Sequence, residues 1–174
     1  MNKDVEFLVS VALRAPTGDN CQPFRFRVEN YETIIIRHIE NRAKHLMNGD
    51  NCASLIALGT MLETISIEAS GIGYLTEIEI LENAGIGKDS DWACIKLIKS
   101  ADVKHDELVG AYQQRWTCRQ LYSDDQLSDE IIQKCIQHGH QNVLDVGIKY
   151  GKPKANEFIN YLELCEQFLW KHKN

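Results

Sequence analysis

The sequence has no excess of positive charge and no long apolar run. Acidic residues outnumber basic ones by 25 to 19, giving a net charge of −6, whereas a surface that binds nucleic acid usually shows a basic excess. No stretch reaches the roughly eighteen apolar residues that a membrane helix needs. The N-terminus continues into an acidic amphipathic segment rather than an apolar signal core. We therefore expect a soluble cytoplasmic protein that binds neither nucleic acid nor membrane.

Cysteine and histidine are present, but they form no familiar metal or disulfide motif. The six cysteines include no CxxC pair, and among the six histidines only His138 and His140 lie close together. Two histidines at a helix end more often complement the helix dipole than bind a metal. Disulfide frameworks belong mainly to small secreted domains, so we expect free thiols and no metal site. Cys21 and Cys118 lie in two polar motifs described below, where a tolerated small residue is the simpler interpretation.

The residues that are present predict helices and strands in an irregular order. The 174 residues, 44% of them hydrophobic, suffice for one hydrophobic core. Their periodicity predicts helices over 3–14 and from Ser54 to about Gly71, and strands over 24–28, 33–39, 76–81 and 92–98. The first two strands are expected to form a hairpin, and the last two to be antiparallel neighbours. This order favours an α+β fold over a doubly wound parallel sheet.

The helix that opens at Ser54 has the clearest pattern. Its apolar residues cover much of its circumference, so we expect a central helix against which a sheet packs. Ala57 and Gly59 would allow another element to approach it closely. In the strand over 76–81, Ile78 and Ile80 alternate with glutamates and are expected to face inward.

Beyond residue 104 the pattern predicts three further helices. A short helix is expected over 106–112, and a second is expected to begin after Ser128 and to end at 138–140. Ile131 and Cys135 would lie on its apolar face. A last amphipathic helix is expected over 155–170.

The run from Ala15 to Phe24 joins the first helix to the first strand and is rich in polar groups. It combines a hydroxyl, a glycine, two amide side chains and two prolines. Backbone N–H groups and fixed side-chain donors and acceptors suit a polar heterocycle or a polyol chain. The alternative is an ordinary turn, because Pro, Gly, Asn and Asp serve turns for backbone reasons alone.

A second polar motif runs from Arg115 to Arg119. Two guanidiniums flank the hydroxyl of Thr117, and arginine offers planar paired donors to a phosphate. The alternative is a pair of solvated surface arginines.

Together the two motifs resemble those of the nitroreductase family. The run Ala15 to Phe24 is similar to the family loop Pro-Ser-x-x-Asn-x-Gln-Pro-Trp, with Thr17 in place of Ser and Phe24 in place of Trp. The segment 115–121 is similar to Arg-x-Ser-x-Arg-x-Phe, with Thr and Leu as replacements. The segment 51–73 resembles the long central helix of the family.

The resemblance implies a flavoprotein. Members bind FMN, take hydride from NAD(P)H and pass electrons to a nitro- or quinone-like small molecule, and their flavin site is shared between the subunits of a homodimer. Because the cofactor carries the chemistry, no side chain is assigned a catalytic role. Arg115 and Thr117 would face the phosphate and Arg119 the isoalloxazine, and the ribityl chain or ring would be lined by Thr17, Gly18, Asn20 and Gln22.

The arginine motif follows the loop, whereas in ordinary family members it precedes it. This order is similar to the double-length, Acg-like branch, in which two nitroreductase-like halves form an internal pseudo-dimer. The resemblance then implies a single domain over 1–174, with a core half at 1–104 and the beginning of a second half at 105–174. Other family flavin contacts have no clear counterpart after Tyr122. A non-catalytic relative that sequesters flavin or serves as an interaction domain therefore remains the alternative.

Overall fold

The computed structural model describes residues 2–44, 46–120 and 127–140. The chain divides into two compact units, Met1–Trp116 and Thr117–Asn174, which are described separately. The helix predicted over 155–170 lies outside the described residues. The five cysteines among the described residues are free thiols.

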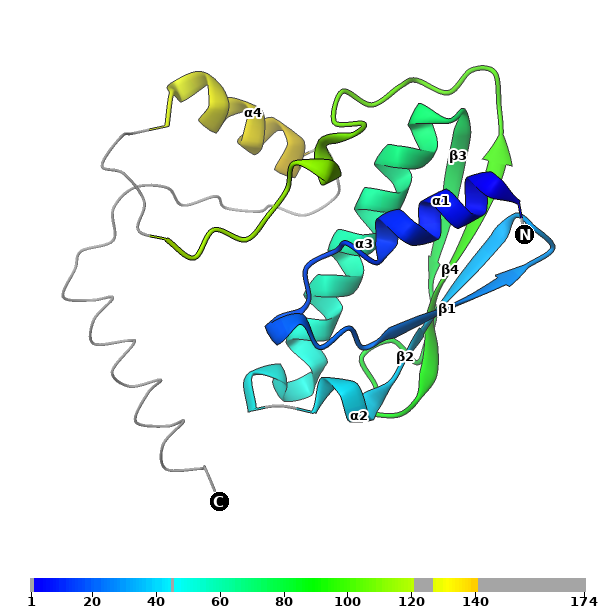
Figure 1. Cartoon of the computed structure of the whole chain (residues 1–174), viewed down its shortest axis with the longest axis vertical. Coiled ribbons are helices and arrows are strands. Elements are labelled where there is room, and N and C mark those ends of the chain that lie inside the picture. The colour runs from blue at the N-terminus through cyan, green and yellow to red at the C-terminus, as the bar shows by residue number, and fades with distance from the viewer. Residues whose placement is uncertain (1, 45, 121–126, 141–174) are drawn as a thin grey trace. The chain divides into compact units, whose positions relative to one another are not determined.

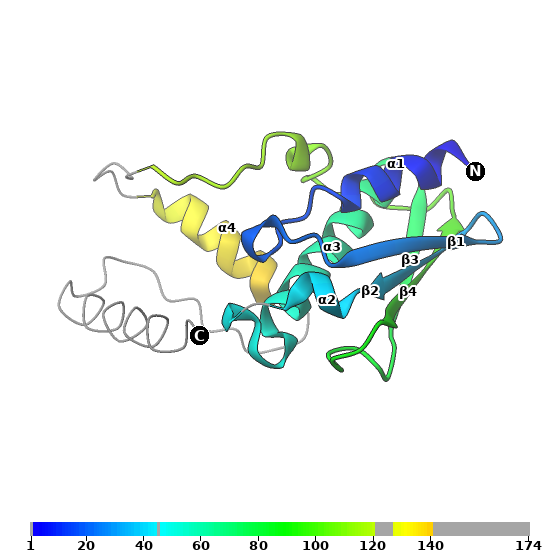
Figure 2. The same cartoon turned by 60° about the horizontal axis from the view of Figure 1, so that its bottom comes forward.

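The first unit is a four-stranded antiparallel sheet with two helices on one face (Figures 1 and 2). The strand order is β1-β2-β4-β3. The predicted hairpin and the predicted antiparallel pair are both confirmed. The α+β class, with an antiparallel sheet packed against a central hydrophobic helix, is therefore confirmed. The strands are β1 (Phe24–Glu29), β2 (Thr33–His38), β3 (Tyr74–Ile80) and β4 (Ser90–Lys99).

Helix α1 (Lys3–Ala12) begins at Asn2, whose side chain accepts a hydrogen bond from the Asp4 amide at 3.1 Å. It ends two residues before the predicted 3–14 boundary, ahead of Pro16. Val5 and Leu8 are fully buried on its inner face. The Tyr74 hydroxyl donates to an Asp4 carboxylate oxygen at 3.0 Å, which ties the start of the helix to the start of β3.

Helix α3 (Cys52–Gly71) forms the core, although not in every detail predicted. By length and composition alone, the segment Asn48–Gly71, which includes α3, could cross a membrane, as many core helices also could, and 44% of its apolar window is buried inside the protein. Ile56 is 72% exposed. The close approach predicted at Gly59 is wrong, because nothing lies within 4 Å of a Cβ built there. The close approach occurs at Gly71, as described below.

The inward orientation expected of Ile78 and Ile80 is not matched by burial. Cross-strand pairing places Ile78 opposite the buried Ile95, so it lies on the helix-covered side of the sheet. The two side chains are nevertheless 41% and 56% exposed. Alternation identified the face correctly, but it carries no information on how far the covering helix extends.

Two of the later predictions need correction. The helix predicted over 106–112 is absent from this described segment, which forms turns and a short 3₁₀ helix, η3 (Ala111–Gln113). Gly110, at φ 84°, has the left-handed backbone that ends helical geometry.

In the second unit, α4 (Asp129–His140) begins as predicted, with Ser128 Oγ accepting from the Ile131 amide at 3.4 Å. Cys135, however, is exposed, and Ile131 is 48% exposed.

The start of α3 is held by a side chain from the preceding segment. That segment contains α2 (Glu40–Ala43) and the 3₁₀ helix η2 (Leu46–Asn51). The buried Asn48 accepts from the Ser54 amide at 3.0 Å and donates to the Ala43 carbonyl at 2.9 Å and to Ser54 Oγ at 3.0 Å. It therefore satisfies an N–H in the first turn of α3 that has no partner within the helix.

We expect Asn48→Ala to lower the free energy of unfolding by about 2 kcal/mol, because several buried polar groups lose their partner at once. Urea denaturation measures the change. Asn83→Ala is the matched control, since Asn83 is exposed in the β3–β4 turn, and its effect should stay within about 0.5 kcal/mol. Equal effects of the two substitutions would contradict this role for Asn48.

His38 is a fully buried histidine at the end of β2. Its ring stacks on Trp92 with centroids 3.9 Å apart and planes 13° from parallel, and the edge of Phe24 completes the cluster. Neither ring nitrogen has a hydrogen-bond partner among the described residues. Burial lowers the pKa of His38 below its ordinary 6.5, and the nearby carboxylates of Asp89 and Glu40 oppose this only in part.

Acidification should therefore destabilise the fold through His38. The unfolded chain binds a proton as the pH falls through about 6.5, while the folded chain resists it, so stability is lost below that pH by up to about 1.4 kcal/mol per pH unit. Denaturation midpoints at pH 7.5 and 5.5 test this. His38→Phe should flatten the dependence relative to wild type, whereas the exposed control His105→Phe should not. If His38→Phe shows the same change of denaturation midpoint with pH as the wild type, His38 is not the group that makes stability depend on pH.

Candidate functional site

The loop singled out from the sequence has an unusual backbone. It contains the 3₁₀ helix η1 (Gly18–Asn20), and three residues that are not glycine have positive φ: Asp19 at 48°, Asn20 at 55° and Gln22 at 48°. Each such residue costs about 1 kcal/mol, so the conformation persists only if other interactions impose it.

Hydrogen bonds within the loop supply that stabilisation. The amides of Asn20 and Cys21 donate to the carbonyls of Thr17 and Gly18, both at 3.0 Å. The Gln22 amide donates to Thr17 Oγ1 at 3.2 Å, and Gln22 Nε2 donates to Asn20 Oδ1 at 2.9 Å. The backbone N–H groups of Asn20, Cys21 and Gln22 are thus engaged inside the loop. On the side chains, hydrogen-bonding capacity remains at Asn20 Nδ2 and Gln22 Oε1.

The loop is also fixed to the elements around it. Thr17 and Gly18 line one small crevice together with Ala53 and Ala57 of α3. Arg42 of α2 donates to the Gln22 carbonyl at 3.1 Å. Asp19 and Asn20 remain exposed at the surface. The loop is therefore a fixed platform that presents a few side chains outward.

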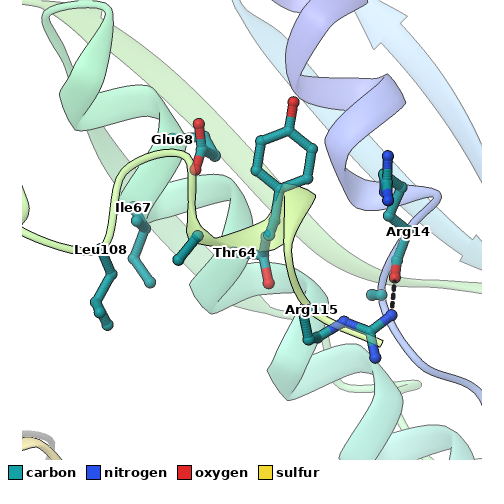
Figure 3. A pocket seen from close by; sticks show the side chains of 9 residues that line it. Arg14, Thr64, Ile67, Glu68, Leu108 and Arg115 are labelled. Atoms are coloured by element: carbon teal, nitrogen blue, oxygen red, sulfur yellow. Dashed lines mark hydrogen bonds between the residues drawn. The ribbon is translucent and has the colours of Figure 1, made fainter. Parts of the chain in front are cut away.

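Arg115, the first residue of the second motif, lies beside this loop. Its Nη2 donates to the carbonyl oxygen of Arg14 at 2.8 Å, immediately ahead of the loop (Figure 3). The structure thus places one predicted site residue of the second motif against the residue that precedes the first motif. Thr117 and Arg119 are exposed and belong to the second unit, so their distance from the loop is not defined.

A cavity of about 170 Å³ adjoins Arg115. Tyr112 forms one side, with the Arg14 guanidinium 5.6 Å from its ring centroid. Glu68, only 3% exposed, accepts a hydrogen bond from the Gly110 amide at 2.6 Å. Figure 3 shows the lining residues Arg14, Ala15, Thr64, Ile67, Glu68, Leu108, Ala111, Tyr112 and Arg115.

Sequence reasoning missed Glu68. The available signal was its position: it lies one turn after the inward-facing Ile65 and next to Ala69, on the buried face of α3. A carboxylate at such a position needs a hydrogen-bond partner, because burying a charge without one is costly. That partner comes from outside the helix, and the sequence gives no indication of it.

The described residues fit the polar groups of FMN in part. The guanidinium of Arg115 keeps N–H groups beyond the one used by Arg14, and these suit a phosphate or a ring carbonyl. Asn20 and Gln22 offer a donor and an acceptor at the surface of the loop. The arrangement can therefore bind a polar, anionic molecule, and it presents no nucleophile paired with a base.

Comparison with known proteins adds two similar folds. No family model and no curated protein sequence matches the chain. A solved structure of a putative NADH oxidase from Clostridium acetobutylicum is 13% identical, with a TM-score of 0.48 over 70% of this chain and 90% of that one. A nitroreductase family protein from Clostridium difficile 630 is 16% identical, with a TM-score of 0.47 over 73% and 88%. Neither similarity assigns a role to a residue of this chain.

Proposed function

We propose that this chain binds FMN and acts as a nitroreductase-like oxidoreductase, taking hydride from NAD(P)H and passing electrons to a nitro- or quinone-like small molecule. One observation carries the proposal. The hydrogen bond from Arg115 to the Arg14 carbonyl spans 101 residues of sequence and links the first residue of the arginine motif to the residue that immediately precedes the loop motif. Nothing in the local sequence of either motif requires this contact.

The roles proposed for the residues follow from their remaining hydrogen-bonding capacity. Bound flavin would supply the redox chemistry, and the chain would position it. Arg115 would bind the phosphate, with Thr117 and Arg119 completing the motif. Asn20 and Gln22 would contact the ring or ribityl chain from the fixed loop. Thr17 and Gly18 would hold that loop against α3.

A second candidate is a relative of this fold that binds flavin without catalysis or serves as an interaction domain. The observation that favours it is the hydrogen bond between Gln22 and Asn20, together with the engaged loop amides. A donor and an acceptor that already bond to one another must exchange partners to bind a ligand, which reduces the net gain.

We further propose that the protein is a cytoplasmic homodimer. Ile56 of α3 and Ile80 of β3 are large apolar side chains, 72% and 56% exposed, and a partner subunit would cover such residues. A symmetric dimer is the commonest assembly that does so. Sedimentation analysis measures the oligomeric state, and a strict monomer at micromolar concentration would overturn the proposed homodimer.

The visible spectrum of the purified protein, before and after addition of FMN, tests the function. Oxidised flavin absorbance that stays with the protein, and NAD(P)H consumption stimulated by a quinone or nitroaromatic, would support an oxidoreductase. Tight FMN binding without turnover would favour the non-catalytic candidate. A colourless protein that fails to bind added FMN would overturn the proposal.

A further inference from the structure

Residues 105–116, here called the strap, follow β4 in the chain and pass over α3 to Arg115, which lies beside the loop (Figures 1 and 3). Three hydrogen bonds hold the strap to the helices and the loop. The Asp106 amide donates to Ser70 Oγ at 3.0 Å, the Gly110 amide to Glu68 Oε1 at 2.6 Å, and Arg115 Nη2 to the Arg14 carbonyl at 2.8 Å. The strap therefore begins on α3 and ends at the predicted flavin loop.

Close packing at Gly71 determines how closely the strap approaches α3. A Cβ built on Gly71 would lie 2.7 Å from Cγ1 of Val109 and 3.1 Å from its Cγ2. Such distances are too short for carbon atoms, so any larger residue would lift the strap or displace Val109.

Gly110 is the point at which the strap turns toward the loop. Its φ of 84° lies in the left-handed region, and nothing lies within 4 Å of a Cβ built there. The bond that fixes it is charge-assisted and mostly shielded from water, because Glu68 is 3% exposed. From Gly110 onward, η3 forms a short spacer, closed by bonds from Gln113 N to the Gly110 carbonyl and from Gln114 N to the Ala111 carbonyl.

We infer that Glu68 is a positioning residue for Arg115. Because Glu68 holds the Gly110 amide, it fixes the start of η3. Since η3 is short, its position in turn determines where the Arg115 guanidinium lies beside the loop. The expected effect of Glu68 on FMN affinity rests on the proposed function. The ordering of the strap by Glu68 does not depend on flavin.

The first test compares FMN affinity among variants of the whole chain. Glu68→Leu removes the acceptor and should weaken FMN binding about tenfold, whereas Glu68→Gln keeps an acceptor oxygen and should stay within about threefold of wild type. Glu63→Leu is the matched control, an exposed glutamate on the same helix, and should leave affinity unchanged. Equal affinities for Glu68→Leu and wild type would overturn the inference.

A double-mutant cycle separates positioning from a general structural role. If Glu68 acts through Arg115, then Glu68→Leu should weaken FMN binding little further once Arg115→Ala is present. Fully additive losses would overturn the inference, because they mean that the two residues act independently.

Amide hydrogen exchange without flavin distinguishes failure of this inference from failure of the proposed function. Glu68→Leu should speed exchange at Gly110 and along η3 at least tenfold while leaving the sheet amides unchanged. Gly110→Ala, which strains the same point without touching α3, should do the same and guards against a Glu68→Leu chain that does not fold. Unchanged strap exchange in a folded variant would overturn the inference, even if FMN binds. A wild-type chain that does not bind FMN while its strap responds as expected would overturn only the proposed function.

Discussion

Replacing Trp92 with alanine is expected to lower the free energy of unfolding by about 3–5 kcal/mol, the range seen when a large aromatic side chain is removed from a packed core. Trp92 is fully buried, and its indole is the centre of an aromatic cluster. It stacks on His38 and meets Phe24 edge to face, with ring centroids 5.9 Å apart. The cluster joins β1, β2 and β4, so the cavity left by the indole would open between three strands.

The chain contains a matched control. Trp116 is 73% exposed, and Trp116→Ala should change stability by no more than about 0.5 kcal/mol. Urea denaturation of both variants measures the difference. A small loss for Trp92→Ala, comparable to that of Trp116→Ala, would mean that the cluster does not organise the sheet.

The sheet could be predicted from the sequence because its signals are local. The turn between β1 and β2 has Asn30 and Tyr31 at its centre, both with positive φ, and Glu32 N bonds back to the Glu29 carbonyl at 3.2 Å. Two residues of positive φ suit the twist of a hairpin. Apolar and basic residues alternate along β1 and β-branched residues are concentrated in β2, so the hairpin boundaries fall within one residue of those predicted.

The strap could not be predicted, because its conformation is imposed from a distance. Leu108 and Tyr112 have helical spacing, and by local preference the segment 106–112 is a short helix. Tertiary bonds to Ser70 and Glu68 instead engage amides of this segment, and tertiary contacts routinely override weak helical preference. His38 was missed for a related reason: its burial depends on Trp92 and Phe24, which are distant in sequence.

Only part of the arrangement of the candidate site could be predicted from the sequence. Composition and spacing selected the loop residues, whose role in binding stays a prediction, and the structure shows a left-handed backbone at Asn20 and Gln22. The contact between Arg115 and the loop depends on the path of the strap, which no local pattern encodes. The roles of Thr117 and Arg119 remain predictions from the resemblance.

Replacing Arg115 with alanine is expected to weaken FMN binding about 100-fold, since a charge-assisted, paired contact to phosphate is among the strongest polar interactions. Arg115→Lys should recover only part of this loss, because an ammonium keeps the charge but not the planar pair of donors. Riboflavin, which has no phosphate, should show a much smaller difference between wild type and Arg115→Ala. Fluorescence titration measures all of these affinities.

Arg25→Ala is the matched control for this result. Arg25 is also exposed and also donates to a backbone carbonyl, that of Phe24 at 2.8 Å, but it projects from β1 on the sheet side opposite the buried Phe24. Arg25→Ala removes the same charge as Arg115→Ala, so a general electrostatic effect on an anionic ligand would weaken binding similarly in both variants. Loss confined to Arg115→Ala, and to the phosphate-bearing ligand, would assign the phosphate to this side chain. Equal losses for FMN and riboflavin would instead show that Arg115 supports the loop rather than the phosphate, because its bond to the Arg14 carbonyl would then be its main contribution.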